Sequence, residues 1–184
     1  MSLSGHQSPV MGKDEWLTPP EILARLGEFD LDPCAPMHNI RPWETAKKHY
    51  CKEENGLQQQ WSGRVWLNPP FGKVAVNWLR RMAKHGNGIA LIPARTETAM
   101  FYECVWGAAH AVLFIKGRPH FHHVSGERAS FNSGAPICLV AYGQENVYAL
   151  RRSNLGVVLA IKEEADNDNC AAIAMSAAKE PGHE

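Results

Sequence analysis

A rigid polar turn, Asn68-Pro69-Pro70-Phe71, carries the residue types in this chain that are best suited to chemistry. Each proline fixes its own φ near about −65° and favours an extended residue before it. The prolines also remove two N–H donors, so the turn offers a ligand two acceptors, the Asn68 side-chain oxygen and the Pro69 carbonyl. Phe71 adds a flat apolar face, on which a nucleobase stacks with about 1–3 kcal/mol.

These acceptors suit methyl transfer to an exocyclic amine. The amino nitrogen of adenine or cytosine is a poor nucleophile because its lone pair is delocalised into the ring. Acceptors that hold its two N–H bonds favour a pyramidal nitrogen, and such contacts raise the rate if they strengthen in the transition state and are rigidly placed. A second interpretation stays open from these residues alone: a proline-rich turn that ends a strand, with Phe71 in the core.

Four ordered segments carry a resemblance to a known family. They are Asp14 to Glu21 (DEWLTPPE), Leu31 to Ala35 (LDPCA), Val65 to Gly72 (VWLNPPFG) and Ile92 to Thr96 (IPART). Together they resemble the phage-type (Dam-like) DNA N6-adenine methyltransferases, which use S-adenosylmethionine. The resemblance implies that Asn68, Pro69, Pro70 and Phe71 are the catalytic residues, and it suggests a phage or prophage origin and a link to restriction-modification.

The resemblance also implies a set of cofactor-binding residues: Trp16, Thr18, Pro19, Asp32, Pro33, Asn55 and Asn68. Asp32 ends a short expected strand over residues 29–32, and doubly wound sheets bind ligands at carboxyl strand ends. The chain departs from the usual pattern, because no glycine-rich turn follows Asp32 and Asn55 stands where Asp is common. Ordinary Asp-Pro and Asn-Gly turns remain the alternative interpretation at these two places.

The most basic stretch, residues 116–128, interleaves basic side chains with Phe121. Such loops suit contacts to phosphates and bases. We predict DNA contacts from Lys116, Arg118, His120 and Arg95, although Arg95 suits a carboxylate partner equally well. His120, His122 and His123 lack an acidic or Cys ligand pattern nearby, so we predict no metal site.

Composition indicates one domain. The chain has 184 residues, of which 45% are hydrophobic. We expect an arm over residues 1–13, a domain over 14–162 and an acidic, Ala-rich tail over 163–184.

Charge and cysteine content limit the partners and the setting of the chain. Lys plus Arg and Asp plus Glu number 19 each, so any DNA contact is local. Five cysteines without a CxxC pair predict reduced thiols in the cytoplasm. The sequence has no apolar run for a membrane span and no signal peptide.

Alternating helix and strand patterns predict a doubly wound α/β sheet. We expect helices over residues 18–27, 74–85, 97–108 and 146–152, and strands over 29–32, 88–94, 111–115, 136–142 and 156–161. Thr18 should be the N-cap of the first helix, with Glu21 completing a capping box, and residues 39–60 should hold at most one short strand or helix. The resemblance implies a single-domain Rossmann-like methyltransferase sheet, mostly parallel, with one antiparallel strand near the C-terminus.

The function we expect is site-specific transfer of a methyl group from S-adenosylmethionine to N6 of a flipped adenine in DNA, without an obligate protein partner. Two rivals remain. Protein-glutamine methyltransferases use a similar turn but carry a glycine-rich cofactor loop that this chain lacks. The second rival is a non-catalytic DNA-binding protein on a decayed methyltransferase scaffold. The intact Asn68-Pro69-Pro70-Phe71 turn argues against this rival.

Overall fold

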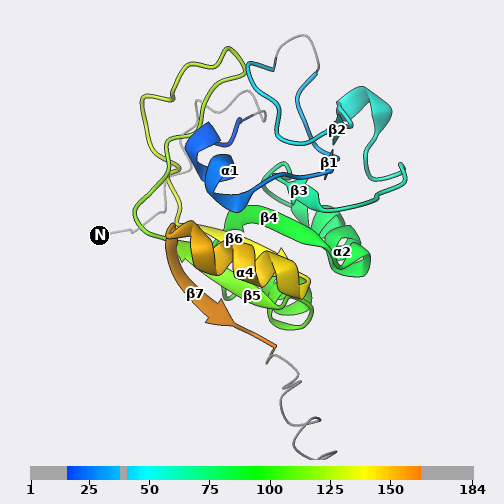
Figure 1. Cartoon of the computed structure of the whole chain (residues 1–184), viewed down its shortest axis with the longest axis vertical. Helices are drawn as coiled ribbons and strands as arrows, with labels where there is room; N and C mark the ends of the chain where they lie inside the picture. Colours follow the sequence, from blue (N-terminus) through cyan, green and yellow to red (C-terminus); the bar gives the residue numbers. More distant parts are fainter. Residues whose placement is uncertain (1–15, 38–40, 163–184) are drawn as a thin grey trace, which may run out of the picture.

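The computed structural model describes residues 16–37 and 41–162, which form one seven-stranded sheet with helices on both faces (Figure 1). The predicted arm (1–13) and tail (163–184) lie outside the described residues. The strands are β1 (Leu31–Asp32), β2 (Lys48–His49), β3 (Val65–Leu67), β4 (Gly88–Pro93), β5 (Ala111–Ile115), β6 (Ile137–Tyr142) and β7 (Gly156–Ala160). The helices are α1 (Pro20–Leu26), the 3-10 helix η2 (Lys52–Glu54), α2 (Ala75–His85), α3 (Ala99–Phe101), the π-helix η3 (Tyr102–Trp106) and α4 (Gln144–Ser153).

The sheet is mixed, with the strand order β2-β1-β3-β4-β6-β5-β7. Its first four strands pair in parallel, whereas β6 pairs antiparallel with β4 and β5, and β7 pairs antiparallel with β5. The expectation of a mostly parallel sheet with one antiparallel strand is therefore not confirmed, since β6 and β7 both run against the others. Apolar runs reveal that a strand is buried but do not encode its direction, which the connections decide.

Alternate residues of the central strands pack against two different helix layers. Ile89 and Leu91 of β4 lie in the cluster that contains the apolar faces of α1 and α4. Ala90 and Ile92 lie in the cluster with α2, α3 and η3 on the opposite face. Both faces of the sheet are thus covered, which explains why its central strands are continuously apolar.

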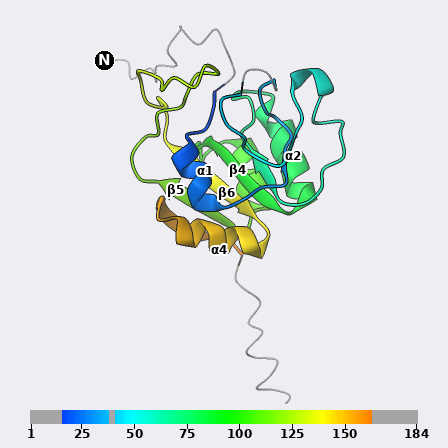
Figure 2. The ribbon, with the colours of Figure 1, turned by 45° about the horizontal axis from the view of Figure 1, so that its top comes forward.

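The carboxyl ends of β1, β3, β4 and β5 share one edge of the sheet. From β1 the chain moves outward to β2 and then returns to the other side of β1 as β3. The connections therefore diverge between β1 and β3, which is where α/β sheets leave a ligand crevice. Figures 1 and 2 show the yellow-green loop after β5 and the cyan segment around β2 projecting from the same end of the molecule.

Helix α1 starts differently from the prediction. Its N-cap is Pro19, and no side chain caps the helix, so the predicted capping box of Thr18 and Glu21 is wrong. The Pro19 carbonyl accepts the first helical hydrogen bond, from the Ile22 N–H at 3.0 Å. Thr18 is only 1% exposed, and its neighbour Leu17 pairs with His122 in the loop after β5.

Two other segments also differ. Residues 39–60 hold both β2 and η2, one element more than expected, and β1 spans two residues rather than four. The expected helix over 97–108 starts at Ala99 and widens into the π-helix η3. The Tyr142 hydroxyl, buried on β6, donates to the Cys104 carbonyl at 2.8 Å and thus fastens the π-helix to the sheet.

Candidate active site

Asn68 directly follows β3, at the edge where ligands of α/β sheets bind. Its side-chain amide nitrogen donates to the Trp16 carbonyl at 2.9 Å, which leaves the side-chain oxygen as the other end of the amide. Pro69 is buried, and within residues 16–37 and 41–162 no N–H is directed at its carbonyl. The turn thus carries two acceptors on adjacent residues, the Asn68 side-chain oxygen and the Pro69 carbonyl.

Phe71 stands beside these acceptors with 40% of its surface exposed. The edge of its ring packs against Phe121, with ring centroids 6.4 Å apart and planes at 76°. Phe121 is only 6% exposed and belongs to the core, so it supports the exposed ring from behind. Phe71 is thus an exposed ring on a fixed support rather than a core residue.

A short ribbon joins the segment before α1 to the loop after β5. Leu17 and His122 exchange two main-chain hydrogen bonds of 2.9 and 3.0 Å, and His122 also pairs with Arg128. The Trp16 ring lies 4.9 Å from that of His123. The Thr18 hydroxyl is buried and has no hydrogen-bond partner among the described residues. An orphaned buried hydroxyl is costly, and a ligand that bonds to it removes that cost.

Asp32 is 3% exposed at the end of β1, and its own chain uses both of its oxygens. One accepts from the Cys34 N–H at 3.0 Å and the other from the Thr45 hydroxyl at 2.5 Å. Burial raises the pKa of Asp32 to about 6, against the opposing effects of the hydrogen bonds from Thr45 and Cys34 and of the charge on Arg41. Asp32 therefore holds the segment around Thr45 in place and does not face solvent.

Pro33 and Gly56, the residue after Asn55, pack together at the same strand end. A Cβ on Gly56 would lie 1.9 Å from the Pro33 carbonyl oxygen, so the chain packs there in a way that only glycine permits. Asn55 is exposed and takes the left-handed conformation with φ of 52°. Asp32 and Pro33 thus lie at the end of β1, the strand next to β3, and Asn55 precedes the residue that packs on Pro33.

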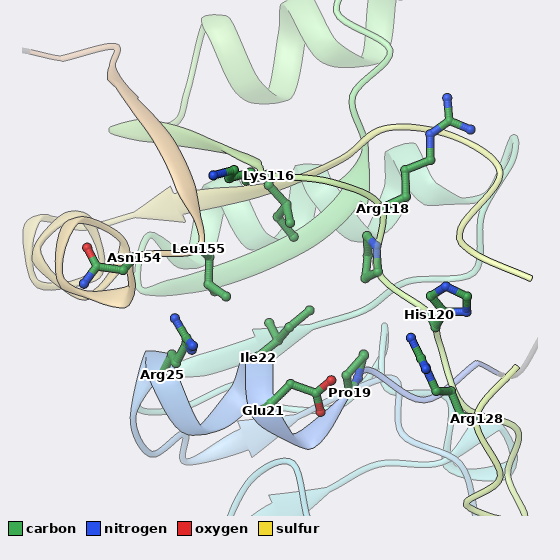
Figure 3. Close-up of a pocket in the computed structure, with 12 residues that line it drawn as sticks. Pro19, Glu21, Ile22, Arg25, Lys116, Arg118, His120, Arg128, Asn154 and Leu155 are labelled. Atoms are coloured by element: carbon green, nitrogen blue, oxygen red, sulfur yellow. The ribbon is translucent and has the colours of Figure 1, made fainter.

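An open pocket of about 320 Å³ lies between α1 and the segment that follows β5. Figure 3 shows α1 as one wall, the segment 116–120 as the facing wall, and Asn154 and Leu155 at one end. Its lining is basic and apolar: Pro19, Glu21, Ile22, Arg25, Ile115, Lys116, Arg118, Pro119, His120, Arg128, Asn154 and Leu155. The predicted DNA-binding residues Lys116, Arg118 and His120 therefore gather here, together with Pro19.

Two of these side chains are held by main-chain carbonyls. Arg118 donates to Gly134 at 3.1 Å, and the Nδ1 of His120 lies 3.1 Å from the Ala129 oxygen. Arg95 follows β4 and is exposed, but it does not line this pocket. A second open pocket, of about 370 Å³, lies between α1 and residues 44–47. Neither pocket is lined by Asn68 or Asp32.

In the described part of the chain, no group of three or more His, Cys, Asp or Glu side chains is arranged to hold a metal ion. Of the three histidines near Phe121, each has a different neighbour. His120 lies against the Ala129 carbonyl, His122 contacts the Trp43 ring edge-on at 5.2 Å, and His123 contacts Trp16. These contacts give the histidines a packing role in the loop.

Sequence reasoning missed several partners of the site. Thr45 and Arg41, which surround Asp32, follow no recognisable motif. Arg25 enters the basic pocket from the last turn of α1, and its guanidinium donates to the Ser153 carbonyl at 3.2 Å. Only the facing wall of the basic pocket had a signal in the sequence. This signal was the alternation of basic and aromatic residues over 116–128, a range that includes Phe121 and Arg128.

A comparison with known proteins gives one match. A protein-family model described as DNA N-6-adenine-methyltransferase (Dam) matches residues 5–168. No curated protein and no solved structure matches the chain. Among the described residues, no helix combines the length and apolar character that crossing a membrane requires.

Proposed function

Because this chain belongs to the DNA N-6-adenine-methyltransferase (Dam) family, we propose that it transfers a methyl group from S-adenosylmethionine to the N6 amino group of adenine in DNA. The observation that carries the proposal is the pair of acceptors on Asn68 and Pro69 beside the exposed ring of Phe71. This pair matches the two N–H bonds of an exocyclic amine, and the ring matches the base that carries it.

Each residue of the turn has a distinct role in this proposal. The Asn68 side-chain oxygen and the Pro69 carbonyl accept the two N–H bonds, while Phe71 stacks on the base. Pro70 keeps the turn rigid, so the acceptors need no rearrangement in the transition state. With the methyl group that S-adenosylmethionine would supply, the amine held by Asn68 and Pro69 would gain the methyl and lose one proton to solvent. A paired adenine must first be extruded from the duplex.

The residues at the crevice between the ends of β1 and β3 suit the binding of S-adenosylmethionine. The buried Thr18 hydroxyl without a described partner and the Trp16 main chain lie on the Asn68 side. Pro33 follows Asp32 at the end of β1, and it packs on Gly56, the residue after Asn55. When bound, S-adenosylmethionine supplies an electrophilic methyl group. Since both Asp32 oxygens bond within the chain, Asp32 acts by fixing the main chain of Cys34 and the side chain of Thr45.

We further propose that DNA lies across the edge where β3, β4 and β5 end. Lys116, Arg118 and His120 would contact phosphates from the basic pocket, which Pro19 also lines, and Arg95 would add a contact beside β4. The divergence of the chain between β1 and β3 supports a Rossmann-like arrangement of the parallel half of the sheet.

One experiment tests the reaction. The protein is incubated with cofactor labelled in the methyl group and with unmethylated DNA, the DNA is digested to nucleosides, and the labelled nucleoside is identified. Label in N6-methyldeoxyadenosine, which appears far more slowly with Asn68→Ala, is the expected result. Label in cytosine, in protein glutamine or in no product would contradict the proposal.

A further inference from the structure

Phe131 has the most exposed large apolar side chain of the described residues, with 85% of its surface in contact with solvent. A single exposed apolar residue needs no explanation by itself. Phe131 differs from a scattered surface residue in three respects: its backbone is held, a short path of contacts links it to the exposed ring of Phe71, and its segment of the chain has an excess of cations.

The backbone that follows Phe131 is fixed by hydrogen bonds. The Ser133 N–H donates to the Pro119 carbonyl at 2.9 Å, and the Ser133 hydroxyl donates to the Ala135 carbonyl at 2.7 Å. The Gly134 N–H donates to the Asn132 side chain at 3.2 Å. The loop therefore forms a defined turn while it keeps the Phe131 ring in solvent, at the energetic cost of an exposed apolar surface.

A short path of contacts joins Phe131 to Phe71. Phe71 packs on Phe121 at 6.4 Å, and the Phe121 carbonyl accepts from the Ala129 N–H at 2.8 Å. Phe131 follows two residues later, so its Cα lies at most about 13 Å from that of Phe121. This upper limit on the distance between Phe131 and Phe121 equals about four base steps of about 3.4 Å each.

The segment of the chain that carries Phe131 has an excess of positive charge. Between residues 116 and 136 the chain has Lys116, Arg118 and Arg128 but only one acidic residue, Glu127. Arg118 donates to the Gly134 carbonyl at 3.1 Å and thus lies against the turn that carries Phe131. An apolar ring among cations suits a partner with an anionic exterior and an apolar, stacked interior, which is duplex DNA.

We infer that Phe131 is a wedge that enters the base stack of duplex DNA when the target adenine leaves it. The inference rests on the proposed function, which requires the base to be extruded. Apolar side chains inserted between base steps unstack and kink DNA, and the ring offsets part of the stacking that the extruded base loses. Lys116, Arg118 and Arg128 hold the flanking phosphates.

The first test compares duplex with single-stranded DNA, because only the duplex has a stack to open. Phe131→Ala should lower the ratio of the duplex rate (kcat/KM) to the single-strand rate about five- to hundredfold, the scale of one lost stacking contact. Phe131→Trp should restore the ratio. Tyr102→Ala is the matched control, since it removes an aromatic ring that is 64% exposed on η3. An unchanged ratio for Phe131→Ala would overturn the wedge.

The second test needs no methyl transfer, so it separates the wedge from the proposed reaction. Closed circular DNA is relaxed with a topoisomerase in the presence of saturating protein, and its linking number is measured after the protein is removed. The wild type and Tyr102→Ala should shift the linking number, whereas Phe131→Ala should bind DNA and shift it much less. A wild type that binds without a shift, or an equal shift for Phe131→Ala, would contradict the inference even if methylation is observed.

Discussion

The side-chain amide of Asn68 is anchored to the main-chain carbonyl of Trp16 by a 2.9 Å hydrogen bond between residues 52 positions apart. Because the nitrogen and oxygen of a carboxamide lie on opposite sides of its carbon, anchoring the nitrogen fixes the direction of the oxygen. The segment before α1 therefore orients the acceptor at the end of β3, and preorganised acceptors are what amine activation requires.

Asn68→Ala should lower the single-turnover rate of methyl transfer by about 10² to 10³, the scale for removing one preorganised polar contact. Cofactor and DNA affinities should change little, because the side chain acts in the transition state. Asn68→Asp keeps one acceptor but sets a second oxygen against the Trp16 carbonyl, so its rate should lie between those of alanine and the wild type. An Asn68→Ala enzyme as fast as the wild type would refute the role.

Asp32→Asn tests the buried carboxylate through pH. The folded-state pKa of about 6 exceeds the ordinary value of 3.8, so the folded protein binds more protons than the unfolded chain between these values. The contribution of Asp32 to stability is therefore greatest below pH 4 and falls as pH rises to about 6, by about 3 kcal/mol in total. Chemical denaturation at pH 4.5 and 7.5 measures the free energy of unfolding of both proteins. Relative to the wild type, the free energy of unfolding of Asp32→Asn should be higher at pH 7.5 than at pH 4.5.

A pH-independent difference between Asp32→Asn and the wild type would contradict this account. The same variant also informs the proposed cofactor site. Since Asp32 fixes Cys34 and Thr45, the asparagine, which keeps an acceptor, should bind S-adenosylmethionine better than Asp32→Ala does. Calorimetry on both folded variants measures the difference.

Most helices and strands, and the position of the Asn68-Pro69-Pro70-Phe71 turn at the end of a strand, were predictable because their signals are local. The Asn68-Pro69-Pro70-Phe71 turn and the apolar run of β4 are contiguous in the sequence. The partners of the site were not predictable, because they depend on residues brought together by the fold. Nothing near Asp32 in the sequence indicates Thr45. The predicted start of α1 was wrong for the same reason: Thr18 is buried beside the pairing of Leu17 with His122, two residues far apart in the sequence, and its side chain does not cap the helix.

Replacing Lys116 and Arg128 together with glutamine should weaken DNA binding and lower its dependence on salt. If each contacts one phosphate, the slope of log affinity against log salt should fall by up to about 2. Lys84→Gln with Lys162→Gln is the matched control, because these exposed lysines lie at the opposite edge of the sheet. An equal loss in both double variants would show that overall charge, not the basic pocket, binds DNA.

Arg64 should contribute strongly to stability. Its guanidinium donates to the Leu26 and Glu28 carbonyls and to the Asn146 side chain at 2.9, 2.8 and 2.7 Å, a fork that lysine cannot reproduce. Arg64→Lys should cost about 3 kcal/mol and lower the Tm by about 6–12 °C.

The matched control for Arg64→Lys is Arg80→Lys, which changes an exposed pair with Glu103 at 2.6 Å. This control should shift the Tm much less, because solvent-exposed ion pairs contribute little. Equal shifts in thermal unfolding would contradict the role of Arg64.

The position of β6 between β4 and β5 determines when a growing chain can first become active. During synthesis β5 emerges before β6, so it has no bridge to β4 until Tyr142 has left the ribosome. Until then the loop after β5 has only one fixed end, and His122 cannot be held against Leu17. A nascent or prematurely terminated chain would therefore carry the complete Asn68-Pro69-Pro70-Phe71 turn without its supports. Competence to modify DNA should arise in one step, late in translation.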